Sequence, residues 1–558
     1  MKVNKNITKY KAYPVFQFNE RTWPAKKLEV PPVFCSVDLR DGNQALPNPM
    51  GIDAKLRFFD LLVEMGFKEI EIGFPSASDT EYNFLRRLIE ENRIPLDVKV
   101  QVLVQAREHL ISKTFEALKG VHAAIVHVYN STSTLQRDVV FQKSKEEIKA
   151  IAKEGAQLLV DYAAKYPETR FTFQYSPESF TGTEMDYALE VVEAVIDVWQ
   201  PTVENKAIVN LPATVEMTTP NVFADQVEWF SKNMKNRDCV MISLHTHNDR
   251  GTSVAATELG ILAGADRVEG TLFGNGERTG NLDLYNLAMN YYSQGIEPNI
   301  YVEEVNRVIE TYESCTGLFL SDRHPYAGKL VYTAFSGSHQ DAIRKGLSVY
   351  EKSQDKIWEI PYLPIDPADI GRLYEPIIRI NSQSGKGGIA YILESEFGYK
   401  APKAMHPEIA KKVQSKTDEL GRELSNQEIL EIFEMKFVNS NQPHGIHSFS
   451  YAYNDQEKDS MIVHANVTIN GVNKDVSGKG NGPVSAFFNA IRSMLEGSYE
   501  LVSYDEHALS DSANAEAAAY IQLKNQEGIR RYGVGRDSNI DSASIRAIMS
   551  ALNNFEEK

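Results

Sequence analysis

Residues 240–264 read VMISLHTHNDRGTSVAATELGILAG, a short apolar run followed by a longer stretch with helical spacing. The run VMISL has the length and the apolar character of a buried strand. The stretch that follows ends in Gly264, and helices often end in glycine. The segment therefore predicts a strand that leads into a helix, and the fold depends on how often this unit recurs.

The same unit recurs from about residue 33 to residue 290. Eight strand-like runs alternate with helical segments, and they read VFCSVDL, KEIEIGF, VKVQVLV, AAIVHVY, RFTFQYS, KAIVNLP, VMISLHTH and DRVEGTLF. Eight alternations in a span of this length favour a closed (β/α)8 TIM barrel over an open doubly wound sheet. In such barrels the active site lies where the strands end, so polar residues at those positions are the candidate site residues.

The chain has 558 residues, which exceeds what one hydrophobic core usually serves. We predict an N-terminal arm over residues 1–32, a catalytic barrel over 33–295, a mostly helical connecting region over 296–439 and a C-terminal α+β domain over 440–558. The arm is too short for a core of its own. It is expected to lie against the barrel or a partner subunit.

The C-terminal domain contains an internal repeat. The segments KDVSGKGNGPVSAFFNAI and RRYGVGRDSNIDSASIRAI each suggest a strand, a Gly-x-Gly loop and then a helix. Two copies predict a module with pseudo-twofold symmetry. Glycine loops before helix N-termini favour a carboxylate site, although structural turns explain the glycines equally well.

Composition excludes several classes of partner. A net charge of −17 argues against nucleic acid or an anionic membrane, because both require a basic surface. No apolar segment is long enough to span a bilayer, and the N-terminus MKVNKNITKY lacks the apolar core of a signal peptide. The three cysteines, Cys35, Cys239 and Cys315, have no metal-type spacing and are interpreted as packing residues. Their number suits a reducing compartment, so a cytoplasmic location is expected.

Two histidines end the seventh strand-like run. His245 and His247 are two residues apart, so on a strand they project from the same face. They are either a pair of metal ligands or ordinary polar residues at a solvated strand end. The first run ends in DLRDGNQ, and Asp41 adds a carboxylate from another strand end. One carboxylate and two imidazoles can hold a divalent cation and leave positions open for a substrate.

Other strand ends contribute to the same predicted cavity. After the eighth run, GNGERTGN supplies Asn281 as a further oxygen ligand and Glu277 as a support for the ligands. Arg40 is either a salt-bridge partner or a permanent charge that stabilises an oxyanion. Glu178 is either catalytic or a partner of an arginine or the backbone. Candidate substrate-binding residues are Gln44, Asn210 and Thr214, the last as a hydroxyl donor to a carboxylate.

The motifs RDGNQ, SPESF, NLPATVEM, SLHTHNDRG, GNGERTGN and FSGSHQDAIRKG, in this order, resemble those of the 2-isopropylmalate synthases in their longer form. The resemblance covers nearly the whole chain. Homocitrate synthases, citramalate synthases and hydroxymethylglutaryl-CoA lyases are similar in RDG and HxH. Many of these carry Asp-Thr-Val-Gly at strand six, whereas residues 213–216 here read Ala-Thr-Val-Glu. That departure favours the isopropylmalate enzymes.

The resemblance implies a Claisen-type condensation of acetyl-CoA with 3-methyl-2-oxobutanoate, followed by hydrolysis of the thioester. Mg or Mn is the implied metal and Zn is a further possibility; its implied ligands are Asp41, His245, His247 and Asn281. Arg40 would polarise the ketone. The implied base is Glu178 or His339, the latter supplied by the partner subunit of an obligate homodimer with composite active sites.

The resemblance also implies that leucine, the end product, inhibits the enzyme through the C-terminal domain. The glycines of the repeat are the implied site, namely Gly480, Gly482, Gly533 and Gly535. Two alternatives stay open: a related enzyme that uses another 2-oxo acid, making citramalate or homocitrate, and an amino-acid sensor with an inactive barrel. The intact Arg40, Asp41, His245 and His247 argue against the sensor.

Overall fold

A computed structural model describes residues 7, 9–334, 336–354, 357–374, 386–420, 424–453, 460–510 and 515–556. The chain divides into two compact units. Residues 1–332 with 365–373 form the first unit, and residues 333–364 with 374–558 form the second. Each unit is described by itself below.

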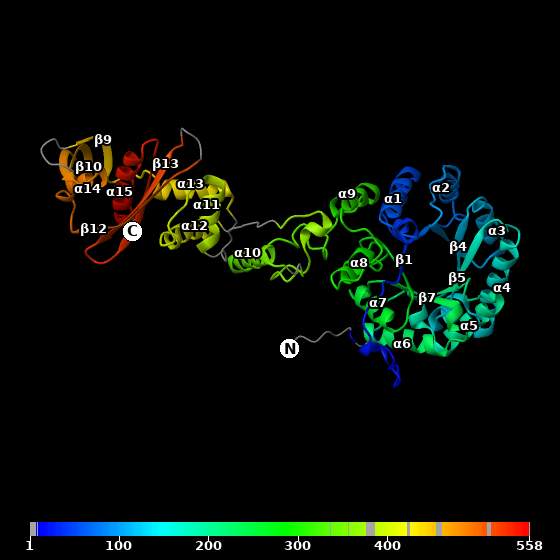
Figure 1. The fold of residues 1–558 in the computed structure, drawn as a ribbon. Coiled ribbons are helices and arrows are strands. Elements are labelled where there is room, and N and C mark those ends of the chain that lie inside the picture. The colour runs from blue at the N-terminus through cyan, green and yellow to red at the C-terminus, as the bar shows by residue number, and fades with distance from the viewer. Residues whose placement is uncertain are drawn as a thin grey trace. The chain divides into compact units, whose positions relative to one another are not determined.

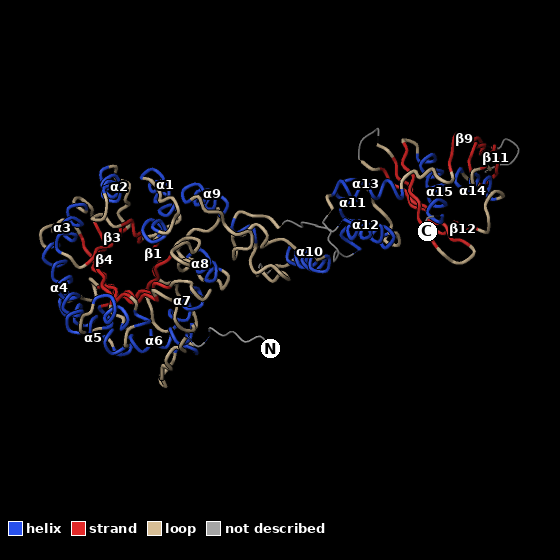
Figure 2. Tube along the Cα trace, turned by 180° about the vertical axis from the view of Figure 1, so that it is seen from behind, coloured by secondary structure: helices blue, strands red, loops and turns tan. Residues whose placement is uncertain are grey.

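The first unit contains the predicted barrel. Eight parallel strands pair in sequence order, and β1 pairs with β8 to close the sheet. The strands are β1 (Val33–Ser36), β2 (Glu69–Gly73), β3 (Lys99–Gln105), β4 (Ala123–Ser131), β5 (Arg170–Glu178), β6 (Ala207–Ala213), β7 (Val240–Thr246) and β8 (Arg267–Gly270). Figure 2 shows them as a ring with the helices outside it. The predicted fold class is confirmed.

A helix follows each strand of the barrel. These helices are α1 (Ile52–Glu64), α2 (Asp79–Glu90), α3 (Glu108–Ala117), α4 (Lys145–Ala163), α5 (Met185–Trp199), α6 (Pro220–Asn233), α7 (Ser253–Leu262) and α8 (Leu284–Tyr292). Local sequence fixes where they begin. In α4, for example, Ser144 and Glu147 form a capping box that satisfies backbone N–H groups at the first turn.

Charged side chains of the strands lie inside the barrel, beneath the candidate site. In β2 the buried residues Ile70 and Ile72 alternate with buried Glu69 and Glu71. Glu69 binds Arg267 of β8, and since β2 and β8 both flank β1, these charged side chains point into the barrel. Strand alternation thus gives the helices an apolar surface and gives the interior its charged groups.

The N-terminal arm lies against the barrel. Trp23 donates from Nε1 to Asp225 of α6 at 2.8 Å, and Tyr13 donates to the carbonyl of Thr181 at 2.7 Å. After the barrel, α9 (Val305–Thr316) packs on α1. No described helix is long and apolar enough to cross a membrane. Cys35 and Cys315 are buried and Cys239 is partly exposed, and all three are free thiols.

The second unit starts with helices and ends in two similar sheets (Figure 1). The helices are α10 (Gly337–Lys352), α11 (Lys386–Phe397), α12 (His406–Leu420) and α13 (Asn426–Phe437). The first βββα copy is β9 (Gly445–Tyr453), β10 (Met461–Ile469), β11 (Val472–Gly480) and α14 (Pro483–Arg492). The second is β12 (Tyr499–Ala508), β13 (Ala517–Asn525), β14 (Arg530–Asp537) and α15 (Ile540–Glu556). The predicted internal repeat is confirmed.

The glycines of this repeat do not form the expected loops. Gly480 is the last residue of β11, and Gly533 and Gly535 lie within β14. A Cβ at Gly535 would collide with the carbonyl of Ala543 on α15. These glycines let a helix approach its strand closely, so the prediction of Gly-x-Gly loops is wrong there. Gly482 is the N-cap residue of α14 and has open space around it.

Candidate active site

The carboxyl ends of the barrel strands enclose a cavity of about 200 Å³. Its lining includes nine predicted site residues, which are Arg40, Asp41, Gln44, Glu178, Asn210, Thr214, His245, His247 and Glu277. The remaining lining residues are Leu103, His127, Tyr129, Ser176, Pro212 and Arg278. The structure therefore brings together groups that lie more than two hundred positions apart in the chain.

The three predicted metal ligands form one buried cluster. Asp41, His245 and His247 each offer a ligand atom, and these atoms lie within 4.8 Å of one another. The Nε2 atom of His245 is 3.1 Å from Oδ2 of Asp41. One carboxylate and two imidazoles are a donor set that suits a divalent transition metal or Mg.

Two unsatisfied atoms support the same interpretation. Among the described residues, Nδ1 of His247 and Oδ1 of Asn281 are buried without a hydrogen-bond partner. Asn281 forms a β-bridge with His247, and its Nδ2 donates to the carbonyl of Asn275 at 3.0 Å. Buried polar atoms normally have partners, so two orphans beside the cluster fit a bound cation.

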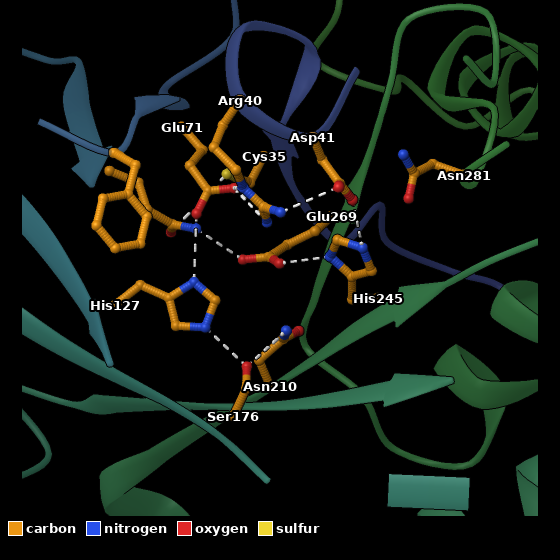
Figure 3. Close-up of polar contacts among 12 residues, drawn as sticks. Cys35, Arg40, Asp41, Glu71, His127, Ser176, Asn210, His245, Glu269 and Asn281 are labelled. Carbon is orange, nitrogen blue, oxygen red and sulfur yellow. Dashed lines mark hydrogen bonds and ion pairs between the residues drawn. The ribbon is translucent and has the colours of Figure 1, made fainter. Parts of the chain in front are cut away.

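Arg40 links two carboxylates at the edge of the cluster (Figure 3). Its Nη1 is 3.0 Å from Asp41, while Nε and Nη2 lie 2.8 and 2.7 Å from Oε2 of Glu71. Both nitrogens converge on this one oxygen, and Nε donates the hydrogen bond to it. The guanidinium is thus held between two carboxylates and also lines the cavity, where its other N–H groups can donate to a ligand.

The cluster has strongly shifted protonation equilibria. Burial raises the pKa of Asp41, but the charge of Arg40 and the bond to His245 outweigh it and hold that pKa far below its usual range. Burial lowers the pKa of His245, but bonds to Asp41 and Glu269 raise it to about 9. Burial and the neighbouring His245 lower the pKa of His247 to about 4. At neutral pH Asp41 is therefore a carboxylate, His245 is protonated and His247 is neutral. A bound cation would replace one proton of His245.

The opposite wall carries the other predicted residues. Glu178 is half-buried at the end of β5 and accepts a hydrogen bond from Ser131. Thr214 accepts from the backbone N–H of Ser179 at 2.9 Å, so its own O–H is free to donate into the cavity. Asn210 donates to Ser176 at 3.0 Å, and its Oδ1 has no partner among the described residues.

Gln44 and Glu277 lie at the exposed rim. Gln44 donates from Nε2 to Oε1 of Glu277 at 2.8 Å. Behind the cluster, Oε2 of Glu269 lies 2.9 Å from Nδ1 of His245, a contact that the sequence analysis did not predict. Glu277 lines the cavity and contacts Gln44, and its support of the metal ligands stays a prediction.

His339 lies in the second unit. It is on α10, and its ring stacks on Tyr362 with the ring centroids 4.0 Å apart. The other residues of the predicted site belong to the first unit. A role for His339 in the barrel cavity therefore stays a prediction.

Several polar cavity residues were missed by sequence reasoning. His127 contacts Glu71 through Nδ1 at 3.3 Å and Ser176 through Nε2 at 2.7 Å (Figure 3). Glu71 and Glu269 are fully buried inside strands. A signal was present: a charged residue at alternate positions of an otherwise apolar strand run indicates the interior of a barrel, because the other face must pack on helices.

One part of the lining is apolar. Leu103, Tyr129 and Pro212 come from β3, β4 and β6 and line the same cavity as the cluster. This apolar surface can contact a small branched side chain, while the charged lining groups can bind a carboxylate and a ketone. The cavity is thus suited to a short 2-oxo acid with an apolar substituent.

Known families match successive parts of the chain. The HMGL-like family matches residues 32–311, the alpha-isopropylmalate synthase post-catalytic domain-like family matches 329–394, and the LeuA allosteric (dimerisation) domain matches 423–556. A 2-isopropylmalate synthase of Clostridium acetobutylicum is 58% identical over 99% of both chains. One of Acetoanaerobium sticklandii is 53% identical over 98% of this chain and 96% of that one, and one of Brucella suis is 54% identical over 98% of each.

A closed parallel barrel with a carboxylate, two imidazoles and an arginine at its strand ends defines a barrel enzyme of the HMGL-like class. Within this class, sequence identity above 50% to 2-isopropylmalate synthases over nearly the full length identifies the family. The chain belongs to the 2-isopropylmalate synthase family. The family predicted from the sequence motifs is confirmed, and neither the citramalate and homocitrate alternatives nor the inactive sensor is favoured.

Proposed function

We propose that this protein condenses acetyl-CoA with 3-methyl-2-oxobutanoate and water to give 2-isopropylmalate and CoA, the committed step of leucine biosynthesis. The observation that carries the proposal is the buried Asp41, His245 and His247 cluster in a chain similar to 2-isopropylmalate synthases over its full length. The apolar lining residues Leu103, Tyr129 and Pro212 agree with a branched 2-oxo acid.

The predicted site residues at the strand ends have proposed roles. Asp41, His245, His247 and Asn281 would hold a divalent cation, with Mg or Mn as the proposed metal and Zn as a further possibility. Such a cation polarises a ketone and orients a 2-oxo acid. The N–H groups of Arg40 that face the cavity stabilise the negative charge that develops on the ketone oxygen. Thr214 donates to the carboxylate of the oxo acid, and Gln44 and Asn210 complete its polar contacts.

The base is proposed from two candidates. Glu178 lines the cavity and hydrogen-bonds to Ser131, so it is positioned to take a proton from the acetyl methyl group. His339 would act from the connecting region of a second subunit, and this requires a homodimer with composite active sites. The match of residues 423–556 to an allosteric dimerisation domain supports both a dimer and control by leucine. Leucine is proposed to act through the repeat that contains Gly480, Gly482, Gly533 and Gly535.

A CoA-release assay tests the function. The full-length protein is incubated with acetyl-CoA and, in turn, pyruvate, 2-oxobutanoate, 3-methyl-2-oxobutanoate and 2-oxoglutarate, with Mn²⁺ or with a chelator. We expect the highest kcat/KM with 3-methyl-2-oxobutanoate and no release with the chelator. A higher value for pyruvate or 2-oxoglutarate would reassign the substrate, and metal-independent release would remove the proposed role of the cluster.

A further inference from the structure

We propose that Glu269 is a positioning residue that selects the ring nitrogen through which His245 faces the metal, and that Arg267, Gln101 and Gln174 hold Glu269 in that role. The inference rests on the metal centre proposed above and extends it to residues buried beneath the site. Figure 3 shows Glu269 directly beside the ring of His245.

The two oxygens of Glu269 have different partners. Oε2 lies 2.9 Å from Nδ1 of His245. Oε1 accepts from Nη1 of Arg267 at 2.8 Å, from Nε2 of Gln101 at 2.9 Å and from Nε2 of Gln174 at 2.7 Å. Three donors thus converge on one oxygen and a single imidazole faces the other.

The strand register fixes this arrangement. His245 of β7 and Glu269 of β8 are directly paired positions, and Ser243 pairs with Arg267 in the same register. Arg267 has no exposed surface and also contacts Ser243 at 2.9 Å and Glu69 at 2.6 Å. The carboxylate therefore cannot turn away from the ring without breaking its bonds to Arg267, Gln101 and Gln174.

An ionised carboxylate accepts hydrogen bonds and cannot donate them. Beside the guanidinium of Arg267, Glu269 is ionised, so Nδ1 of His245 must carry its proton toward Oε2. The other ring nitrogen, Nε2, then points at Asp41 and is the atom that a cation can use. A carboxylate behind a ligand ring commonly fixes the tautomer and strengthens metal binding in this way.

A buried ion-pair network with a purely structural role would have the same contacts, so the test must separate the two. Glu269→Gln is nearly isosteric. The three donors around Oε1 require the amide oxygen, which turns the amide NH₂ toward Nδ1 of His245. That ring nitrogen must then accept, so the proton moves to Nε2 and the ligand atom is blocked. Glu69→Gln is the matched control, because Glu69 binds Arg267 in the same network and its described contacts do not include His245.

The experiment measures Mn²⁺ affinity by calorimetry on the full-length chain, without substrates, after treatment with a chelator. We expect Glu269→Gln to weaken binding by about 10- to 100-fold and Glu69→Gln to stay within about threefold of wild type. Thermal unfolding should be altered to a similar extent in both variants. Wild-type affinity in Glu269→Gln, or an equal loss in both variants, overturns the proposal.

A second measurement needs only the wild-type protein. In a crystal structure of the Mn²⁺ complex we expect coordination through Nε2 of His245, with Nδ1 still bonded to Glu269. Coordination through Nδ1, or no metal at His245, overturns the proposal even if Glu269→Gln fails to fold. Neither measurement involves turnover. A failure of the CoA-release assay would therefore refute the proposed function without deciding whether Glu269 positions His245.

Discussion

Replacing Arg40 with lysine tests how the proposed oxyanion is stabilised. The change keeps the positive charge and removes the planar set of five donors. In the structure the guanidinium of Arg40 pairs with both Asp41 and Glu71 and also lines the cavity. A lysine ammonium has three donors at one point, so bonds to both carboxylates would leave one donor in a different place.

The size of the effect follows from that loss. Removing one preorganised donor to a developing oxyanion costs about 2.7–4 kcal/mol, or about 10²- to 10³-fold in kcat. We therefore expect Arg40→Lys to lower kcat by about that factor, with less than about tenfold change in KM for the oxo acid. The assay is CoA release with 3-methyl-2-oxobutanoate at saturating acetyl-CoA and Mn²⁺.

Arg278→Lys is the matched control for this prediction. Arg278 lines the same cavity, but its side chain is 39% exposed and pairs with Asp249 at the rim. Exposed pairs contribute little, so we expect less than about fivefold loss of kcat. The reasoning is refuted if Arg40→Lys keeps kcat within fivefold of wild type, or if both variants lose activity equally.

Three further predictions concern protonation and packing. Because the pKa of His245 is raised to about 9 without metal, a proton competes with the cation, and Mn²⁺ affinity should rise roughly tenfold per pH unit from pH 7 to 9; a flat calorimetric profile contradicts this. Asp38 is buried just after β1, where it accepts hydrogen bonds from Ser36 and from the backbone N–H of Leu272. Burial raises its pKa from 3.8 to about 7, so its contribution to stability is complete below pH 3.8 and is lost as the pH rises to 7. Relative to wild type, the free energy of unfolding of Asp38→Asn should therefore rise by about 1.4 kcal/mol per pH unit between pH 5 and 7, with no further rise by pH 8. Denaturant unfolding measures this difference, and parallel pH profiles for the two proteins contradict it. Gly535→Ala should push α15 away and abolish leucine inhibition with CoA release retained, while Gly482→Ala should remain inhibited; inhibition of both refutes a role for this packing.

The barrel could be predicted because its signals are local. Each strand run and each helix shows its own periodicity, as VMISL and the segment ending at Gly264 illustrate. The cavity residues Asp41, His245 and His247 could be predicted because parallel barrel strands place all their carboxyl ends on one face. Both the barrel fold and the convergence of these residues can be inferred without knowing which side chains are in contact.

The role of the repeat glycines could not be read in the same way. A Gly-x-Gly pattern before a helix has the same letters whether it forms a loop or a strand. What decides at Gly533 and Gly535 is the close approach of α15, which begins at Ile540 and packs back on β14. That approach depends on small residues such as Ala543 further along the chain. Sequence pattern alone does not report this distance.

The charged residues within β2 and β8 explain why the site is built on strands. Burying Glu71 or Glu269 alone would be strongly unfavourable, because each loses its hydration. Each is instead held by an arginine, Arg40 or Arg267, and in turn contacts a cavity histidine. The same carboxylate thus satisfies the barrel interior on one side and orients a cavity group on the other. A shift of one residue between β7 and β8 would turn His245 or Glu269 to the other face, so the strand register contributes directly to the geometry of the proposed metal site.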